Sequence, residues 1–278
     1  MNELQHALIE KFRLLEKWYS QRKGSIVAFS GGIDSTLVLY LARKFQGRDN
    51  AIGVISNSES LKKKDFNLAQ SFCKEFDIQL KIIKTNELKD LRYSKNPINR
   101  CFYCKDHLFN NLLEIKKEYS DFEVLSGTNY DDLGDYRPGI DAAKKNLVLS
   151  PLVDCKLAKN EIREIAKHFN LPNWDKPASP CLSSRIPYNQ AVTVKKLHQI
   201  EAAENLLNMY GFEDVRVRHY GAYAKIEVKK EDMEKLQCLS EKVISTIKEI
   251  GFERVEIDTE GLVSGKMNRV LTSKERKI

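Results

Sequence analysis

The fold of this chain is constrained most by three consecutive features near its start. They are a short apolar segment, a loop that contains glycines, and a helical pattern. Residues 25–29 (SIVAF) are mostly apolar and too few for a helix, so they predict a buried strand. Residues 30–36 read SGGIDST, and a helical pattern then continues to residue 45. Two glycines let the backbone approach a ligand, and a helix start offers free N–H groups to an anion. These residues therefore predict a phosphate-binding loop between a strand and a helix.

The same alternation of strands and helices continues through the first part of the chain. Further strands are predicted at 51–55, 79–83, 123–126 and 147–150, and helices at 2–22, 62–76, 105–119 and 159–169. This order is typical of an α/β fold in which a parallel sheet, here of five strands, carries helices on both faces. Ligands of such sheets bind at the carboxyl ends of the strands, which makes the loops after residues 29, 55, 126 and 150 candidates for the site.

A long irregular crossing separates this part from the rest of the chain. Prolines crowd residues 172–187, and beyond them helices are predicted at 193–210 and 231–250 and strands at 215–219, 224–228 and 254–258. A helix-to-strand junction occurs twice, as GFEDV at 211–215 and GFERV at 251–255. We therefore predict a nucleotide-binding domain over residues 1–175 and a smaller α+β domain over residues 176–278.

Composition excludes several classes of protein. The chain carries 46 basic and 39 acidic residues, a formal net charge of +7, but the excess is spread evenly and forms no basic face for nucleic acid. No apolar run approaches about 18 residues, and the first ten residues lack the apolar segment of a signal peptide. Six cysteines are too sparse for a disulfide scaffold, so we expect a reduced, cytoplasmic protein that does not bind membranes.

The phosphate loop differs from the Walker pattern because no lysine follows Gly32. Ser30, Ser35 and Thr36 add hydroxyl donors, and Asp34 suits a Mg²⁺ ion that accompanies phosphates. A capped helix after an ordinary turn is the plainer interpretation, but it explains less of the string. The string resembles the signature of the PP-loop ATP pyrophosphatase superfamily, whose members cleave ATP between the α and β phosphates and leave AMP on a substrate.

A second polar loop follows the predicted strand at 123–126. Residues 127–132 read GTNYDD, and Arg137 lies a few positions further on. Carboxylates at the carboxyl end of a strand are well placed for Mg²⁺, and a cation such as Arg137 would face the adenylate or the substrate. A surface turn rich in Asn, Asp and Gly is the alternative.

Three of the six cysteines form a pattern. Cys101 and Cys104 make a C-x-x-C motif just before a predicted helix, and Cys181 lies in the string PASPCLSSRIP at 177–187. A four-cysteine zinc site lacks its second C-x-x-C, and a redox pair lacks a thioredoxin-like context. Three thiolates on a [4Fe-4S] cluster, which leave one iron without a protein ligand, are the third interpretation. The remaining cysteines are predicted to be buried core residues: Cys73, Cys155 and Cys238.

Several strings together resemble the LarE family of ATP-dependent sulfur transferases, which make the nickel-pincer nucleotide cofactor of lactate racemase. They are the phosphate loop, RCFYCK at 100–105, GTN at 127–129, RPG at 137–139 and PCLSSRIP at 180–187. In one type of this family, a single cysteine at the position of Cys181 gives up its own sulfur. In the other type, that cysteine joins a C-x-x-C to hold a [4Fe-4S] cluster whose open iron carries a sulfide. The three cysteines here resemble the cluster type.

The resemblance implies a set of site residues and ligands. ATP and Mg²⁺ would be bound by the first domain, through Ser30, Gly31, Gly32, Asp34, Ser35, Thr36, Ser56, Gly127, Asn129 and Asp131. Asp34 and Cys181 would be catalytic, and Cys101, Cys104 and Cys181 would bind the cluster. A substrate nucleotide would be held by Arg100, Arg137, Arg185, Arg216, Arg218, Glu204 and Glu227.

Arg216 and Arg218 also attract attention without the resemblance. Side chains alternate along a strand, so both arginines lie on one face of the strand at 215–219, about 7 Å apart. Two guanidinium groups on one face suit the phosphate or the carboxylates of a nucleotide. A solvated basic face is the commoner alternative. His219 could act as a general acid or base, although a single histidine is more often structural.

We therefore expect an ATP-dependent sulfur transferase. A carboxylate of pyridinium-3,5-biscarboxylic acid mononucleotide would attack ATP to form an acyl-adenylate, and sulfide would then displace AMP to leave a thiocarboxylate. Sulfide or a sulfur donor is the expected partner, and we expect a homo-oligomer.

Three other functions stay open. A tRNA thiolation enzyme predicts a basic stripe or an added RNA-binding module, and neither is evident. An amide-forming adenylating synthetase of the GMP or NAD type leaves the three cysteines unexplained. A non-catalytic nucleotide-binding or iron–sulfur sensor would bind ATP without releasing pyrophosphate.

Overall fold

The computed structural model describes residues 6–263 and 265–272. It divides the chain into two compact units, one of Met1–Glu87 with Asn99–Ser179 and one of Leu88–Ile98 with Pro180–Ile278. The second unit thus takes in residues 88–98, which the sequence-based boundary at residue 175 does not include. Each unit is described by itself below. No helix among the described residues is long and apolar enough to cross a membrane.

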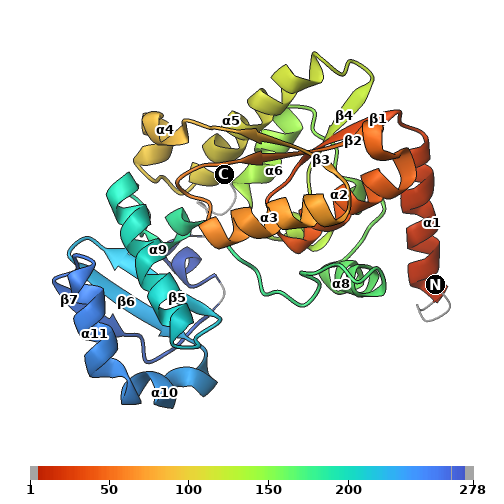
Figure 1. The fold of residues 1–278 in the computed structure, drawn as a ribbon. Coiled ribbons are helices and arrows are strands. Elements are labelled where there is room, and N and C mark those ends of the chain that lie inside the picture. Colours follow the sequence, from red (N-terminus) through yellow and green to blue (C-terminus); the bar gives the residue numbers. More distant parts are fainter. Residues whose placement is uncertain (1–5, 264, 273–278) are drawn as a thin grey trace. The chain divides into compact units, whose positions relative to one another are not determined.

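The first unit is built on a parallel sheet (Figure 1). Its strands β1 (Gly24–Ala28), β2 (Ala51–Ser56), β3 (Gln79–Ile83) and β4 (Phe122–Leu125) pair in the order β3-β2-β1-β4. The fifth strand that we predicted at 147–150 is wrong, since within the described residues it is a single bridge between Leu149 and Leu125. Leu147 has a positive φ of 53°, and Pro151 begins helix α7 (Pro151–Asp154), so little extended backbone remains between them.

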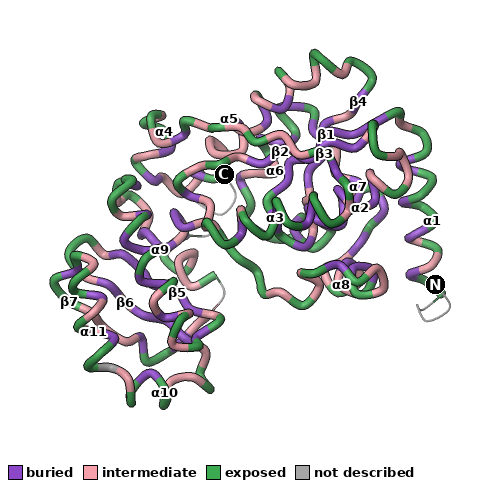
Figure 2. Tube along the Cα trace, in the orientation of Figure 1, coloured by how far each residue is buried: buried purple, intermediate pink, exposed green. Residues whose placement is uncertain are grey.

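Helices cover both faces of this sheet, as the sequence predicts. On one face α1 (His6–Ser20), α2 (Ile33–Gln46), α3 (Lys63–Glu75) and α8 (Lys159–His168) share a core cluster with Val27 of β1. On the other, α5 (Arg100–Lys116) and α6 (Pro138–Lys145) pack with its neighbours Ile26 and Ala28. Alternate side chains of β1 therefore enter different cores, and the strand is buried along its whole length (Figure 2).

Helix α5 begins earlier than the sequence suggests. We predicted its start at residue 105, but it starts at Arg100 with Asn99 as its N-cap residue. Cys101 and Cys104 are therefore the second and fifth residues of this helix and do not precede it. Their spacing of three residues puts both thiols on one face of the helix.

The second unit is a small α+β domain. Strands β5 (Val215–Tyr220) and β6 (Tyr223–Val228) are antiparallel, and β7 (Arg254–Ile257) joins β6 in parallel. One face of this sheet packs on α9 (Val194–Met209), α10 (Met233–Cys238) and α11 (Ser240–Glu249). The single helix predicted at 231–250 is wrong, because the helix breaks at Leu239, where ψ is 0°. The apolar spacing hides the break, since Leu236 and Val243 on its two sides enter the same core.

Residues 88–98 are fixed to the second unit by specific contacts. They contain α4 (Leu91–Ser94), where the hydroxyl of Tyr93 forms a 2.6 Å hydrogen bond with that of Ser183. The side-chain amide of Asn96 donates to the carbonyls of Ile186 (3.1 Å) and Pro187 (2.7 Å). Because Tyr93, Asn96 and Ser183 are all buried, this excursion of the chain is part of the unit and not a surface loop.

Candidate active site

The predicted phosphate loop lies at the carboxyl end of β1, directly before α2. Gly31 has a φ of +72°, a conformation that favours glycine. Inside the loop, Ser35 Oγ donates to the carbonyl of Gly32 (3.0 Å) and forms a hydrogen bond with Ser30 Oγ (3.1 Å). The serines thus fix the loop to the first turn of α2, whose N–H groups are the groups that would meet phosphate oxygens.

The loop after β4 packs directly against this first turn. A Cβ atom added to Gly127 would lie 2.6 Å from the backbone nitrogen of Ser35, so only glycine fits there. Two residues on, Asn129 donates from Nδ2 to Asp34 Oδ1 (3.2 Å). The other oxygen of Asp34 forms an ion pair with Lys159 Nζ at the start of α8. The structure therefore brings together Asp34, Gly127 and Asn129, as the sequence predicts, and adds Lys159, which sequence reasoning missed.

A group of polar residues supports Asn129. Asn129 and Asp132 exchange hydrogen bonds, each from its backbone N–H to the side-chain oxygen of the other, both at 3.1 Å. Burial raises the pKa of Asp132, while the Asn129 N–H and the ion pair with Arg137 (2.9 Å) oppose this shift. Asp131 accepts from the backbone N–H of Lys159 (2.8 Å) and so caps α8. Asp131 and Arg137 are thereby tied to the loop itself, and their predicted roles toward ligands stay predictions.

Residues 173–179 border the other side of the phosphate loop, a contact that the sequence does not reveal. Asn173 Nδ2 donates to the Gly31 carbonyl and to Thr36 Oγ1, both at 2.9 Å. Asp65 in the first turn of α3 is buried, accepts from Ser179 Oγ (2.7 Å) and forms an ion pair with Lys176. The irregular segment that the prolines predict therefore contacts the phosphate loop near its start, through Asn173.

Ser56 lies further along the same edge of the sheet. It ends β2, and its hydroxyl forms a 2.6 Å hydrogen bond with the hydroxyl of Thr85, which follows β3. None of the contacts described for these residues joins Ser56 to the phosphate loop, so its predicted role in binding ATP stays a prediction.

The C-x-x-C cysteines lie in the first two turns of α5. Cys101 is exposed and Cys104 is half-buried, and neither is in a disulfide. The buried guanidinium of Arg100 lies beside Cys101, with 3.9 Å between Nη2 and Sγ. Both cysteines therefore lie near the N-terminal end of a helix, and Cys101 lies beside a guanidinium.

The third predicted ligand, Cys181, belongs to the second unit. It is half-buried, free and directly before the 3-10 helix η4 (Leu182–Arg185). Across the described part of the chain, no three His, Cys, Asp or Glu side chains are gathered so as to hold a metal ion. The three-cysteine cluster site therefore stays a prediction.

The remaining cysteines separate into two kinds. Burial raises the pKa of Cys73 to about 12 and that of Cys155 to about 11, as expected for core thiols. Cys238, which we predicted to be buried, is exposed, and that prediction is wrong. It is the last residue of α10, and the apolar side of this short helix is provided by its neighbour Leu236.

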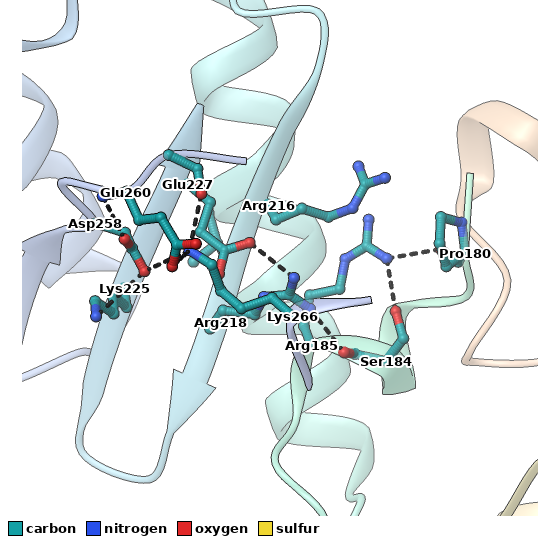
Figure 3. A network of polar contacts seen from close by, with 12 residues as sticks. Pro180, Ser184, Arg185, Arg216, Arg218, Lys225, Glu227, Asp258, Glu260 and Lys266 are labelled. Carbon is teal, nitrogen blue, oxygen red and sulfur yellow. Dashed lines mark hydrogen bonds and ion pairs between the residues drawn. The ribbon is translucent and has the colours of Figure 1, made fainter. Parts of the chain in front are cut away.

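Arg185 anchors a cluster of arginines in the second unit (Figure 3). Its side chain is completely buried, and it pairs with Glu204 through two contacts, Nε to Oε1 at 2.8 Å and Nη2 to Oε2 at 3.2 Å. Its Nη1 donates to the carbonyl of Pro180 and to Ser184 Oγ, both at 2.8 Å. Arg185 thus fixes the segment on either side of Cys181 to α9.

Arg216 and Arg218 lie on the face of β5 that is turned away from the core, as the alternation predicts. Arg218 is buried and donates to Glu227 Oε2 (2.7 Å) and to the Ser184 carbonyl (3.0 Å). Burial, with the positive charge of Arg185 next in size, lowers the pKa of Arg216 to about 10. Three guanidinium groups therefore gather here, a suitable arrangement for an anion.

His219 is better explained by a structural role than by acid–base catalysis. Its side chain is buried, and burial lowers its pKa to about 4, so it is neutral at pH 7. Nδ1 accepts from the backbone N–H of Gly221, and Nε2 forms a hydrogen bond with Gln199, both at 3.2 Å.

A parallel α/β sheet with this phosphate loop at the end of β1, and with an aspartate in place of the Walker lysine, defines an ATP-using enzyme of the PP-loop class. The family model for NAD synthase matches residues 12–99. The chain is also 35% identical over 246 residues to the pyridinium-3,5-bisthiocarboxylic acid mononucleotide synthase of Lactiplantibacillus plantarum. The aligned residues cover 88% of this chain and 89% of that protein. The chain belongs to the LarE family of ATP-dependent sulfur transferases, which confirms the resemblance.

Two uncharacterized proteins are also similar along nearly their whole length. One, from Synechocystis, is 39% identical over 267 residues, which cover 95% of this chain and 99% of the relative. The other, from Methanocaldococcus jannaschii, is 33% identical over 260 residues, which cover 93% and 95%. The similarity therefore extends over both units and not only over the nucleotide-binding sheet.

Proposed function

We propose that this protein uses ATP to convert a carboxylate of pyridinium-3,5-biscarboxylic acid mononucleotide into a thiocarboxylate. The similarity to the Lactiplantibacillus plantarum synthase over both units supports this substrate. The observation that carries the proposal is the group of Asp34, Asn129 and Lys159 around the first turn of α2. A carboxylate for Mg²⁺ and a cation for the phosphates are what transfer of AMP from ATP to a carboxylate needs. An ATP site of this kind activates a carboxylate by making AMP its leaving group.

In the first half-reaction, a substrate carboxylate oxygen attacks the α-phosphorus of ATP and pyrophosphate leaves. The N–H groups of residues 31–36 and the hydroxyls of Ser30, Ser35 and Thr36 would bind the pyrophosphate. Asp34 would hold Mg²⁺, which when bound neutralises phosphate charge. Lys159, ion-paired with Asp34 in the structure, would then turn to a phosphate oxygen.

In the second half-reaction, sulfide attacks the acyl carbon and the carbon–oxygen bond to AMP breaks. Cys101, Cys104 and Cys181 would hold a [4Fe-4S] cluster. The fit of the first two rests on their accessible thiols in one helical turn beside Arg100. When bound by three thiolates, such a cluster supplies one iron that is open to an external sulfur ligand. The sulfur donor, the homo-oligomeric state and the cytoplasmic location stay predictions.

The arginine cluster would bind the substrate nucleotide. Arg216 and Arg218 would contact its phosphate or a carboxylate, and Arg185 would add positive charge from behind. Glu204 and Glu227 are paired with Arg185 and Arg218, so their contribution would be to orient the arginines rather than to touch the substrate. Arg100 and Arg137 remain further candidates for contacts with the substrate, and Arg137 is also a candidate for contacts with the adenylate.

The test is anaerobic turnover with defined reactants. The purified protein is given the mononucleotide, ATP, Mg²⁺ and sulfide, and mass spectrometry and phosphate analysis follow the thioacid, AMP and pyrophosphate. We expect equal amounts of AMP and pyrophosphate, and Lys159→Met should lower the rate about 100-fold without loss of folding. Release of ADP, or no thioacid from a folded protein, would contradict the proposal.

Iron and sulfide are counted in the same preparation. About four irons per chain are expected, with loss of iron in Cys101→Ser, Cys104→Ser and Cys181→Ser. Zinc in place of iron would contradict the cluster.

An amide-forming synthetase is the second candidate, because the NAD synthase model matches the nucleotide-binding part. The same assay with ammonia in place of sulfide distinguishes the two. An amide product formed faster than the thioacid would favour the synthetase.

A further inference from the structure

A chain of charged contacts leads from Arg218 to the C-terminal segment of the second unit (Figure 3). Arg218 is fixed by Glu227 Oε2 and by the carbonyl of Ser184, while its Nε is buried and has no hydrogen-bond partner among the described residues. The second carboxylate oxygen, Glu227 Oε1, lies 3.6 Å from Lys266 Nζ. One glutamate therefore joins an arginine of the proposed substrate site to a lysine outside it.

Lys266 is the cation that several acidic groups share. Its Nζ lies 2.9 Å from Asp258 Oδ2 and 3.4 Å from Glu260 Oε2, and it donates to the Gly261 carbonyl at 2.8 Å. Glu227 and Asp258 are buried, with side-chain exposures of 1% and 8%. Asp258 Oδ2 also pairs with Lys225 at 3.2 Å, but Lys266 is the cation that lies between the two carboxylates, so they would repel each other if its charge were removed.

The backbone of residues 258–262, shortly before Lys266, is held in place independently of these charges. The N–H of Asp258 donates to the Ile226 carbonyl and the N–H of Leu262 to the Val228 carbonyl, both at 2.8 Å. Between them Gly261 has a φ of +76°, and a Cβ there would lie 2.9 Å from the Val228 carbonyl oxygen. This tight turn sets residues 258–262 against β6, and Lys266 is the first residue of the 3-10 helix η6 (Lys266–Val270).

We infer that Lys266 is a positioning residue for Arg218, so that the C-terminal segment completes the anion site of the second unit. The inference rests on the proposed function, in which Arg218 contacts the substrate. Without the Lys266 charge, Glu227 would move away from Asp258. That movement weakens the charged contact that holds the Arg218 guanidinium, whose other described contact is a single carbonyl.

The binding test uses the whole protein and two variants of the same position. Calorimetry measures the Kd for pyridinium-3,5-biscarboxylic acid mononucleotide and, separately, for ATP. Lys266→Met should raise the mononucleotide Kd about 10-fold, and steady-state assays should show the change in KM rather than in kcat. The Kd for ATP should stay within about 2-fold, and Lys266→Arg, which keeps the charge, should recover binding to within about 3-fold. Unchanged mononucleotide binding by Lys266→Met would overturn the inference.

The matched control is Arg269→Met in the same 3-10 helix. Arg269 pairs with Glu260 at the surface, with side-chain exposures of 54% and 45%, and should not affect binding. A double variant separates positioning from general damage. If Lys266 acts through Arg218, adding Lys266→Met to Arg218→Met should weaken binding no further. Additive losses would contradict the inference.

A crystal structure of Lys266→Met distinguishes this inference from the proposed function. We expect the Arg218 guanidinium to leave Glu227 and the Ser184 carbonyl while β5 and β6 keep their pairing. If the guanidinium stays in place, the inference is wrong, whatever the substrate is. If it moves but the wild-type protein does not bind the mononucleotide, the positioning role stands and the proposed substrate is wrong.

Discussion

The nucleotide site of the first unit and the arginine cluster that we propose as the substrate site of the second are built in two different ways. The first relies on the backbone N–H groups of α2, on small hydroxyl side chains and on Gly31 and Gly127, which allow close approach. The second relies on long guanidinium side chains that buried glutamates hold in place. The first site is therefore sensitive to added volume, whereas the second is sensitive to lost charge. The following predictions, from the largest effect to the smallest, would break or sharpen this comparison.

Removing the charge of Glu204 should have the largest effect on stability. Glu204→Gln keeps the shape but leaves the completely buried Arg185 without its carboxylate, which should lower the free energy of unfolding by about 3–5 kcal/mol. Urea denaturation measures the change. The control is Glu10→Gln, whose exposed pair with Arg13 should contribute less than about 1 kcal/mol. Equal effects of the two variants would show that buried charge does not govern the second site.

Adding one methyl group at Gly127 should damage the first site. The new Cβ would lie 2.6 Å from the Ser35 nitrogen, so the loop after β4 or the first turn of α2 must move. We expect a loss of about 3 kcal/mol in stability and a weakened affinity for ATP, measured by urea denaturation and calorimetry. Gly134→Ala in the neighbouring 3-10 helix is the matched control, because nothing lies within 4 Å of its Cβ position. If Gly127→Ala binds ATP as well as the wild-type protein does, the close packing of Gly127 against the first turn of α2 is not needed for ATP binding.

Acidification should weaken the second unit through His219. Burial lowers its pKa from 6.5 to about 4, so between these values the unfolded chain binds more protons than the folded one. Stability should therefore fall as the pH drops through this window, by about 1.6 kcal/mol between pH 6.5 and pH 5. The measurement is the difference between the wild-type protein and His219→Gln in urea denaturation at the two pH values. If the stability difference between the two proteins is the same at both pH values, the pKa of His219 is not lowered by folding and the prediction is wrong.

The smallest effect is expected at Cys238. Because its side chain is exposed, Cys238→Ser should change stability by less than about 0.5 kcal/mol and leave the iron content unchanged. Cys73→Ser, which places a hydroxyl in the core beneath α3, should cost about 1–3 kcal/mol under the same conditions. Loss of iron from Cys238→Ser would mean that the ligands are not the three cysteines that we propose.

Features that short sequence segments encode were predictable. The parallel sheet, the loop at 30–36 and the shared face of Arg216 and Arg218 all follow from local patterns of apolar residues, glycines and alternation. The ends of helices and strands were harder to predict. The predicted strand at 147–150 is a single bridge at Leu149, and the predicted helix at 231–250 breaks at Leu239. In both cases the apolar spacing continued while the backbone changed direction.

Contacts made by tertiary packing were not predictable from the sequence. Lys159 meets Asp34 because α8 packs against α2, and nothing around Lys159 in the chain marks it as a site residue. The same holds for Asn173, whose two hydrogen bonds to the phosphate loop depend on the path of an irregular segment. The partners of Arg185 and Arg218 are likewise fixed by packing, although both arginines were candidates.

The excursion of residues 88–98 affects how the protein can be made. Because Tyr93 and Asn96 are part of the second unit, that unit is discontinuous in the sequence, and a fragment that starts at residue 180 omits one of its segments. Such a fragment would lack the partners of Ser183 and of the Ile186 carbonyl. During synthesis, residues 88–98 leave the ribosome before residues 180–192, so they cannot form these contacts until residues 180–192 have been translated. The second unit therefore reaches its native contacts only late in synthesis.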